Sequence, residues 1–263
     1  MLGSYAAIII PVEKNVQENL LKVYKVILHL IRENYETYYS LKPFTIKVYE
    51  RESNIRPYVR SFGLNTFIIK VYDKEELDHL LDEISGIRVN ISYEKFWVKG
   101  RRIIGTKVCI KNDSLILKNL LLEGGIEIDC ENPNAYIMVI KDPTSFIAYS
   151  ETITTCIKSI EKHYISEIYI TKPWNSIVYG LHLKDVIDDV RTKENEYIIC
   201  KNSYFEELIM AYERNAWFPV VSYSERPLIV CVNNVFKSSS LSYIRLVMNT
   251  IFYALSYSVN VSV

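Results

Sequence analysis

The chain has little glycine or proline, and neither sign of charge is in excess. Of its 263 residues only 8 are glycine and 8 are proline, so long flexible linkers are not expected. Its 31 basic and 31 acidic residues cancel, which gives a pI near 6.9. A dedicated nucleic-acid binder often has a pI above about 9. Any nucleic-acid role must therefore rest on a local basic cluster rather than on the charge of the whole chain.

Recognisable catalytic and metal-binding motifs are also missing. There is no glycine-rich phosphate-binding loop, so an ATP-using domain is not supported. The four histidines, His29, His79, His163 and His182, are isolated and lack the spacing of metal ligands. The five cysteines are far apart and form no Cys-x-x-Cys pair. We expect no metal site, and we expect the cysteines to pack as small buried hydrophobic side chains.

Long hydrophobic runs are absent as well. No apolar run reaches about 18 residues, the length of a membrane-spanning helix. The first residues, MLGSYAAIIIPVEK, lack the basic segment of a signal peptide. The sequence therefore predicts a cytoplasmic protein that does not bind a membrane. Its length suits two or three domains, and its 49% of apolar residues can build a core for each.

The first 92 residues have the pattern of a ferredoxin-like domain. A helix is predicted over residues 16–38 from apolar residues at three- and four-residue spacing. A second helix begins after Asp73, which can cap it. Short apolar or alternating runs predict strands over residues 5–12, 44–50, 67–73 and 87–92. This βαββαβ order predicts an α+β domain of two split βαβ units.

A basic cluster follows this region. Between Arg88 and Lys118 there are eight basic and two acidic residues, which leaves a net charge of +6. Alternation along a strand places Lys99 and Arg101 on one face and Arg102 on the other. Such side chains suit recognition of an RNA backbone by shape. The predicted RNA-binding residues are Lys95, Lys99, Arg101, Arg102, Lys107 and Lys111.

Residues 96–152 resemble the core of a THUMP domain, a module of tRNA-modifying enzymes. The similarity lies in the basic strand FWVKGRRIIGTK, the apolar helix SLILKNLLLEGG, and two strands around the turn Asn132-Pro133-Asn134. The family usually has Asn-Pro-Asp at this turn, so Asn134 replaces an acid. We expect the turn to join Ile126–Cys130 and Tyr136–Ile140 as a hairpin. The resemblance implies a tRNA-binding domain over residues 93–153.

Residues 154–263 predict a third domain, an open and mostly parallel α/β sheet. Its last strand, Ser-rich turn and long helix over 240–257 resemble the closing segment of SPOUT methyltransferases. That resemblance implies S-adenosylmethionine bound near Asn233 and Asn234. The family's loop is usually glycine-rich, whereas this chain has no glycine after Gly180. The other predicted elements are helices over 154–164, 183–191 and 203–215, and strands over 166–172, 196–200, 219–223 and 227–233.

Three functions fit these observations. The first is a tRNA-binding accessory protein in tRNA modification, which presents tRNA to a catalytic partner protein and has no cofactor. The second is an S-adenosylmethionine-dependent tRNA methyltransferase of divergent SPOUT type, acting as a homodimer. The third is an interaction protein without a nucleic-acid role, in which the basic cluster is ordinary surface charge.

Overall fold

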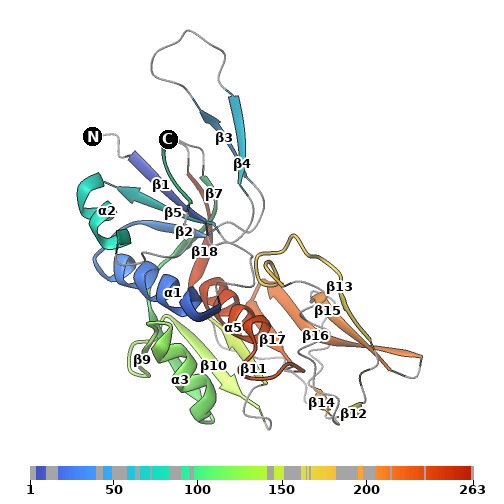
Figure 1. Ribbon diagram of the computed structural model, residues 1–263. Helices are drawn as coiled ribbons and strands as arrows, with labels where there is room; N and C mark the ends of the chain where they lie inside the picture. Colours follow the sequence, from blue (N-terminus) through green and yellow to red (C-terminus); the bar gives the residue numbers. More distant parts are fainter. Residues whose placement is uncertain are drawn as a thin grey trace.

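The computed structural model describes most of the chain (Figure 1). The described residues are 4–9, 17–39, 44–48, 58–62, 66–71, 73–82, 90–94, 98–140, 145–150, 161–163, 165, 167–181, 195–197, 205–213, 215–233 and 235–261. They form a mixed α/β protein with two large open sheets, a pair of two-stranded sheets and helices α1, α2, α3 and α5. The two small sheets are β3 (Phe44–Val48) with β4 (Tyr58–Phe62), and β12 (Glu161–His163) with β14 (Asn195–Tyr197).

The first large sheet has six antiparallel strands in the order β18-β7-β2-β5-β1-β6. Helix α1 (Gln17–Arg32) packs its apolar side against this sheet through Leu20, Val23 and Ile27, which are fully buried. Helix α2 (Lys74–Asp82) starts as predicted, because Asp73 accepts hydrogen bonds from the backbone N–H groups of Glu75 and Glu76. The strands are β1 (Ser4–Ile9), β2 (Thr37–Tyr39), β5 (Thr66–Val71), β6 (Asn90–Glu94), β7 (Val98–Ile103) and β18 (Ser256–Val261).

The second large sheet has eight strands in the order β13-β15-β16-β17-β11-β10-β8-β9. Strand β8 is parallel to both β9 and β10, and every other neighbouring pair is antiparallel. The strands are β8 (Lys107–Lys111), β9 (Glu127–Ile128), β10 (Ala135–Val139), β11 (Phe146–Tyr149), β13 (Glu167–Ile170), β15 (Glu206–Glu213), β16 (Ala216–Glu225) and β17 (Leu228–Val232). Helix α3 (Leu115–Glu123) lies between β8 and β9 in the chain, with Ser114 as its N-cap.

Helix α5 (Leu241–Ala254) joins the two large sheets (Figure 1). It was predicted over 240–257, and the structure confirms a helix over 241–254 with Ser240 as the N-cap, whereas residues 256–261 form strand β18. Nearly all of its residues are buried, as expected for a helix that is covered on all sides. Phe252 contacts the rings of Tyr39 and Phe67 from the six-stranded sheet. The next residue, Tyr253, contacts Tyr223 of the eight-stranded sheet, so both sheets share one core.

Several predicted elements in the last third of the chain are wrong. The strands β13, β15, β16 and β17 are antiparallel to their neighbours, so the sheet is not mostly parallel. The predicted helix over 203–215 is instead strand β15. Its consecutive buried residues Leu208–Ala211 form a short apolar run, which suits a buried strand better than a one-sided helix. Within the predicted helix over 154–164, the described residues 161–163 form strand β12.

The predicted hairpin around Asn132-Pro133-Asn134 is also wrong. Strand β8 lies between β9 and β10, and both are parallel to it. The turn therefore crosses over β8 instead of joining neighbouring strands.

The large sheets do not follow the three predicted domains. Strand β7 belongs to the THUMP-like segment in the chain but lies in the six-stranded sheet, beside β2 and β18. Strand β18 comes from the C-terminal segment and completes that same sheet. In the eight-stranded sheet, β11 of the THUMP-like segment pairs with β17 of the C-terminal segment. The chain therefore interleaves its segments, and the surface near β7 and β8 contains residues from distant parts of the sequence.

Candidate nucleic-acid interface

Arg101 was predicted to contact RNA, and the structure places its guanidinium inside the protein. The residue is only 4% exposed. Its Nε donates to Ser256 Oγ at 2.9 Å, its Nη2 donates to the Ser256 carbonyl at 2.8 Å, and its Cζ lies 4.2 Å from the centre of the Tyr253 ring. Burial lowers the pKa of Arg101, and Tyr253 and Glu225 act against that shift. Arg101 therefore links β7 to β18 and α5, and it cannot meet a phosphate at the surface.

The other predicted residues of β7 are less fully described. Lys95 lies outside the described residues, and for Lys99 only the backbone position in β7 is described. Arg102 points to the opposite face from Arg101 and is half-buried. It lies between Tyr38 and Tyr257 in the cross-strand register. Tyr257 is 44% exposed, so a cation and an aromatic ring are neighbours at this position.

Lys107 and Lys111 share one face of β8, as alternation along the strand requires. Lys107 Nζ lies 2.9 Å from Asp129 Oδ2. This hydrogen bond raises the pKa of Lys107 and lowers the pKa of Asp129. Lys111 is exposed, and its Nζ lies 4.8 Å from the centre of the Tyr136 ring. Tyr136 stacks on Tyr149 with the ring centres 5.2 Å apart, so Lys111 stands over an aromatic pair.

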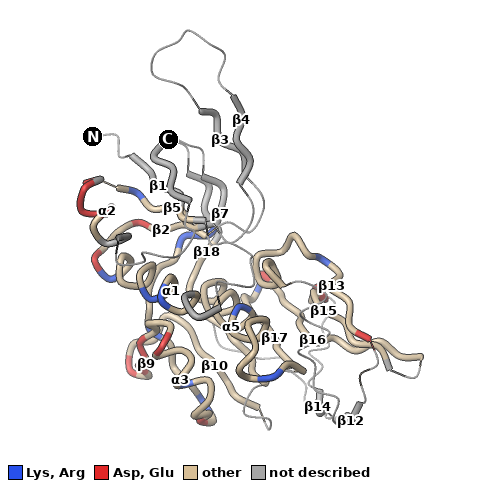
Figure 2. The backbone as a smooth tube through the Cα atoms, viewed as in Figure 1, with Lys and Arg blue, Asp and Glu red and all other residues tan. Residues whose placement is uncertain are grey.

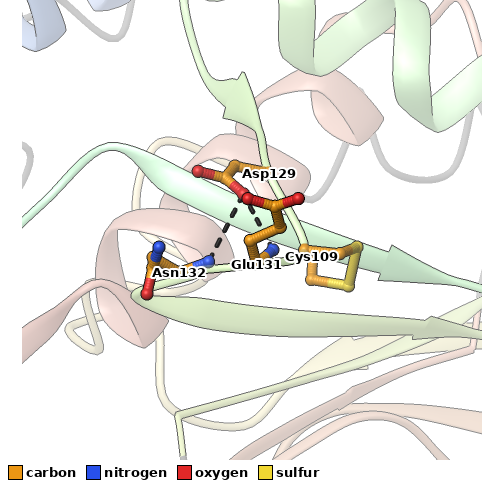
Figure 3. Close-up of a disulfide and its surroundings, with 5 residues drawn as sticks. Cys109, Asp129, Glu131 and Asn132 are labelled. Carbon is orange, nitrogen blue, oxygen red and sulfur yellow. Dashed lines mark hydrogen bonds between the residues drawn. A yellow bond between two sulfur atoms is a disulfide. The ribbon is translucent and has the colours of Figure 1, made fainter.

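The loop after β9 is tied closely to β8. Asp129 Oδ1 accepts hydrogen bonds from the backbone N–H groups of Glu131 at 2.8 Å and Asn132 at 3.3 Å (Figure 3). Asn134 Oδ1 accepts a hydrogen bond from the Lys107 N–H at 3.1 Å, and the Asn134 N–H donates to the Lys107 carbonyl at 2.8 Å. The turn predicted from the THUMP resemblance therefore has a structural role, and it holds Lys107 in place.

A disulfide joins Cys109 of β8 to Cys130 of this loop, with the Cα atoms 4.5 Å apart (Figure 3). Cys231 is also disulfide-bonded. The prediction that the cysteines serve only as small hydrophobic side chains is wrong for these three. Disulfides are typical of oxidising compartments and of intracellular proteins of hyperthermophiles. The cytoplasmic location therefore remains a prediction.

The sequence patterns did not identify a second basic surface, which lies on α1. Its exposed side carries Lys22, Lys25, His29 and Arg32, which follow one another at spacings of three, four and three residues. That spacing places them along one face of the helix, over about 15 Å. The lysine and arginine positions of α1 are blue in Figure 2. Lys22 and Lys25 form no ion pair within the described part of the chain. We call these four residues the α1 basic row.

The α1 basic row borders a groove of about 560 Å³. Arg32 closes one part of it, through an ion pair with Glu127 at 2.5 Å and a hydrogen bond to the Gly125 carbonyl. Gly125 has φ of +88°, and a Cβ there would lie 3.0 Å from the Lys25 Cα, so glycine permits the close approach of α1. The groove is lined by Lys25, Arg32, Leu122, Gly125, Ile126, Glu127, Ile128 and Asp129. Asp129, which lines the groove, pairs with Lys107, so the groove connects the α1 basic row to β8.

The predicted cofactor-binding residue Asn233 is part of the sheet. It is 2% exposed, its Nδ2 donates to the Pro219 carbonyl at 3.0 Å, and its N–H donates to the Val220 carbonyl at 2.7 Å. Asn234 lies outside the described residues. The side chain of Asn233 therefore fastens the end of β17 to β16, and this geometry does not fit a cradle for S-adenosylmethionine.

Two other findings concern the described residues alone. Among them, no three or more His, Cys, Asp or Glu side chains gather as metal ligands would. None of the described helices is both long enough and apolar enough to cross a membrane.

Sequence and structure comparisons give no relative from which a function could be transferred. No protein-family model matches this chain, and no curated protein or solved structure matches it either.

Proposed function

We propose that this chain binds tRNA through its THUMP-like region and acts as an accessory to a catalytic partner in tRNA modification. The observation that carries the proposal is the position of the α1 basic row beside the groove that Asp129 shares with Lys107 of β8, two segments that are far apart in the sequence. Lys111 lies farther along β8, over Tyr136 on the other face of the sheet. Separate cations on one surface are the electrostatic footprint of a phosphate backbone.

The chemistry of β8 adds contacts that suit RNA. Tyr136 is half-exposed beside Lys111, and it is held in place by stacking on Tyr149. Aromatic rings beside cations recognise unstacked bases, whereas the cations alone recognise the backbone. Lys111 and Tyr136 therefore offer a place where a base and a phosphate can bind together.

The strand order of the N-terminal region supports the expected domain type. The segment β6-β1-β5-β2 is antiparallel throughout, and α1 and α2 connect β1 to β2 and β5 to β6 in the chain. This is the arrangement of two split βαβ units. Its second strand is β2, which overlaps the end of the helix predicted over 16–38, whereas the strand predicted over 44–50 pairs with β4 in a separate sheet. THUMP domains are commonly preceded by a ferredoxin-like domain of this kind. The fold alone implies no function, so the proposal rests on the cations.

Binding of a fluorescent tRNA transcript at several salt concentrations tests the proposal. We expect the logarithm of the affinity to fall linearly with the logarithm of the salt concentration. Replacing Lys22 and Lys25 by Ala should weaken binding and reduce the slope by about 2, because each lysine that contacts a phosphate contributes about 1. Arg32 is left unchanged in this test because it also pairs with Glu127.

The matched control removes the same charge elsewhere. The K172A/K237A variant changes two lysines on other elements, one of which pairs with Glu206. It should bind tRNA like the unmodified protein, with the same slope. If both double variants bind alike, the α1 basic row is not the RNA surface. If single-stranded DNA of equal length competes as well as tRNA, the protein binds nucleic acid without recognising tRNA.

A further inference from the structure

Three aromatic side chains form an exposed cluster at the far end of the eight-stranded sheet. Tyr169 of β13 and Trp217 of β16 are 47% and 49% exposed. The Trp217 ring centre lies 5.1 Å from that of Tyr169, at 70° between planes, and 4.8 Å from that of Tyr212 on β15, at 46°. The three rings therefore meet across three neighbouring strands. Large exposed aromatic residues of this kind typically mark binding surfaces.

Hydrogen bonds at the rim hold the two tyrosines in place. Tyr169 Oη donates to Glu167 Oε2 at 3.0 Å, and Tyr212 Oη donates to Asn215 Oδ1 at 3.0 Å. Glu167 raises the pKa of Tyr169, first through this hydrogen bond and then through its charge. Since both hydroxyl groups are engaged, the two tyrosine rings are held in a fixed arrangement beside Trp217. A ligand that binds them would lose less conformational entropy in ordering the site.

The charge around the cluster selects the ligand. Glu167 hydrogen-bonds Tyr169 within the cluster, and Glu213 follows Tyr212 in β15, whereas strands β13, β15 and β16 contain no basic residue. The face of an aromatic ring carries partial negative charge and attracts cations, above all when a carboxylate is nearby. The same field repels phosphate groups. A nucleic acid is therefore the less favoured ligand here, and an arginine or lysine side chain is the more favoured one.

We propose that Tyr169, Tyr212, Trp217 and Glu167 form a docking site for an arginine or lysine side chain of a partner protein. The guanidinium or ammonium group lies over the Trp217 ring and pairs with the Glu167 carboxylate. This site is distinct from the proposed RNA surface. Six strand spacings of about 4.8 Å each separate β13 from β8, which is about 29 Å (Figure 1). The inference rests on the aromatic cluster and its charge, and it does not depend on RNA binding.

The test follows Trp217 directly by fluorine NMR. The chain has three tryptophans, so protein labelled with 5-fluorotryptophan should give three resonances, and the W217F variant assigns one of them. The probe is a hexa-arginine peptide, and hexacitrulline of the same length is its neutral control. We expect hexa-arginine to shift the Trp217 resonance in a saturable way, and we expect hexacitrulline to leave it unchanged.

Matched variants separate this site from general attraction to acidic residues. E167Q should weaken hexa-arginine binding about two- to fivefold. E207Q removes an exposed carboxylate of β15 outside the cluster and should have no such effect. Tyr169→Ala should weaken binding as well, and a near-UV spectrum like that of the unmodified protein would show that the variant is folded.

Four outcomes would overturn the proposal. These are no shift of Trp217 with hexa-arginine, an equal shift with hexacitrulline, equal effects of E167Q and E207Q, or a larger shift with single-stranded oligouridylate than with hexa-arginine. A Trp217 resonance that moves with protein concentration alone would identify a second copy of the chain as the occupant and would also refute it. None of these results would alter the tRNA-binding test, because that test changes residues of α1.

Discussion

Two regions of the molecule carry opposite charge, and we call the first the basic end. Its strands, β8 of the eight-stranded sheet and β7 of the six-stranded sheet, contain five basic residues and no acidic residue, whereas the edge strand β9 beside β8 contains Glu127. Strands β13, β15 and β16, at the other end, contain five acidic residues and no basic residue. The net charge of zero for the whole chain hides this separation. The difference shows that charge must be judged surface by surface when a partner is inferred.

Burial and ion pairing decide which cations at the basic end are exposed and free of a carboxylate partner. Of the cations in β7 and β8, Arg101 is buried and Lys107 is paired with Asp129, whereas Lys111 is exposed. The α1 basic row supplies additional exposed cations. The basic end is therefore defined by the fold rather than by the stretch of sequence that is richest in lysine and arginine.

The largest effect is expected at helix α5, where the two large sheets share one core. Phe252 of α5 is fully buried and contacts Tyr24, Tyr39 and Phe67. Phe252→Ala should lower the free energy of unfolding by about 3–5 kcal/mol, because the cavity removes contacts to α1 and to the six-stranded sheet. Urea unfolding followed by circular dichroism measures this. A single transition is expected, and a variant as stable as the original would show that α5 does not join the two sheets.

The disulfide between Cys109 and Cys130 lies at the basic end. Cys109 and Cys130 close a loop with a sequence separation of 21 residues. Replacing both by Ser should lower the free energy of unfolding by about 3 kcal/mol, chiefly by freeing the unfolded chain. Among amides that exchange by local opening, those around Asn132 should exchange faster, whereas those of β15 and β16 should exchange as before. Faster exchange at both ends alike would contradict a local role.

Substitutions of Arg101 and Lys25 should affect different properties, the first stability and the second RNA binding. Arg101→Ala removes two hydrogen bonds from a buried charged group to Ser256, and should lower the free energy of unfolding by about 2–3 kcal/mol. It should leave the salt slope of tRNA binding unchanged. Lys25→Ala should do the reverse, with a slope lower by about 1 and little change in stability. A reduced slope for folded Arg101→Ala protein would restore Arg101 as a phosphate contact.

The smallest effect is expected for the pair Lys107–Asp129. The pKa of Asp129 is lowered in the folded state, so its contribution to stability is present above the unfolded pKa of about 4. The contribution disappears as the pH falls through the folded pKa. Asp129→Asn keeps the oxygen that accepts from Glu131 and Asn132 but removes the charge. The variant should be less stable than the original at neutral pH, and the two should converge in acid. A difference that is independent of pH would contradict this.

Local patterns predicted the first half of the fold better than the second. The helix spacing around Leu20 and the cap at Asp73 depend on nearby residues, and both were correct. Strand β15 was mistaken for a helix because its burial is decided by β13 and β16, which lie elsewhere in the chain. The pairing of Cys109 with Cys130 likewise requires β8 and the loop after β9 to meet.

The residues of the candidate sites were likewise only partly predictable from local sequence patterns. Lys107 and Lys111 were identified from the basic cluster, whereas burial of Arg101 required knowledge of β18 and α5. The spacing of Lys22, Lys25, His29 and Arg32 is present in the sequence, but their exposure beside the groove depends on how α1 packs against the loop after α3. No local pattern could reveal the aromatic cluster, because its rings come from three separate strands.

The most direct test of the central claim is lysine acetylation of the unmodified protein, with and without tRNA, read by mass spectrometry. We predict that tRNA protects Lys22, Lys25 and Lys111 at the basic end and leaves Lys172 and Lys237 as reactive as before. Equal protection of all five lysines, or protection of Lys172 and Lys237 alone, would contradict the placement of RNA at the basic end.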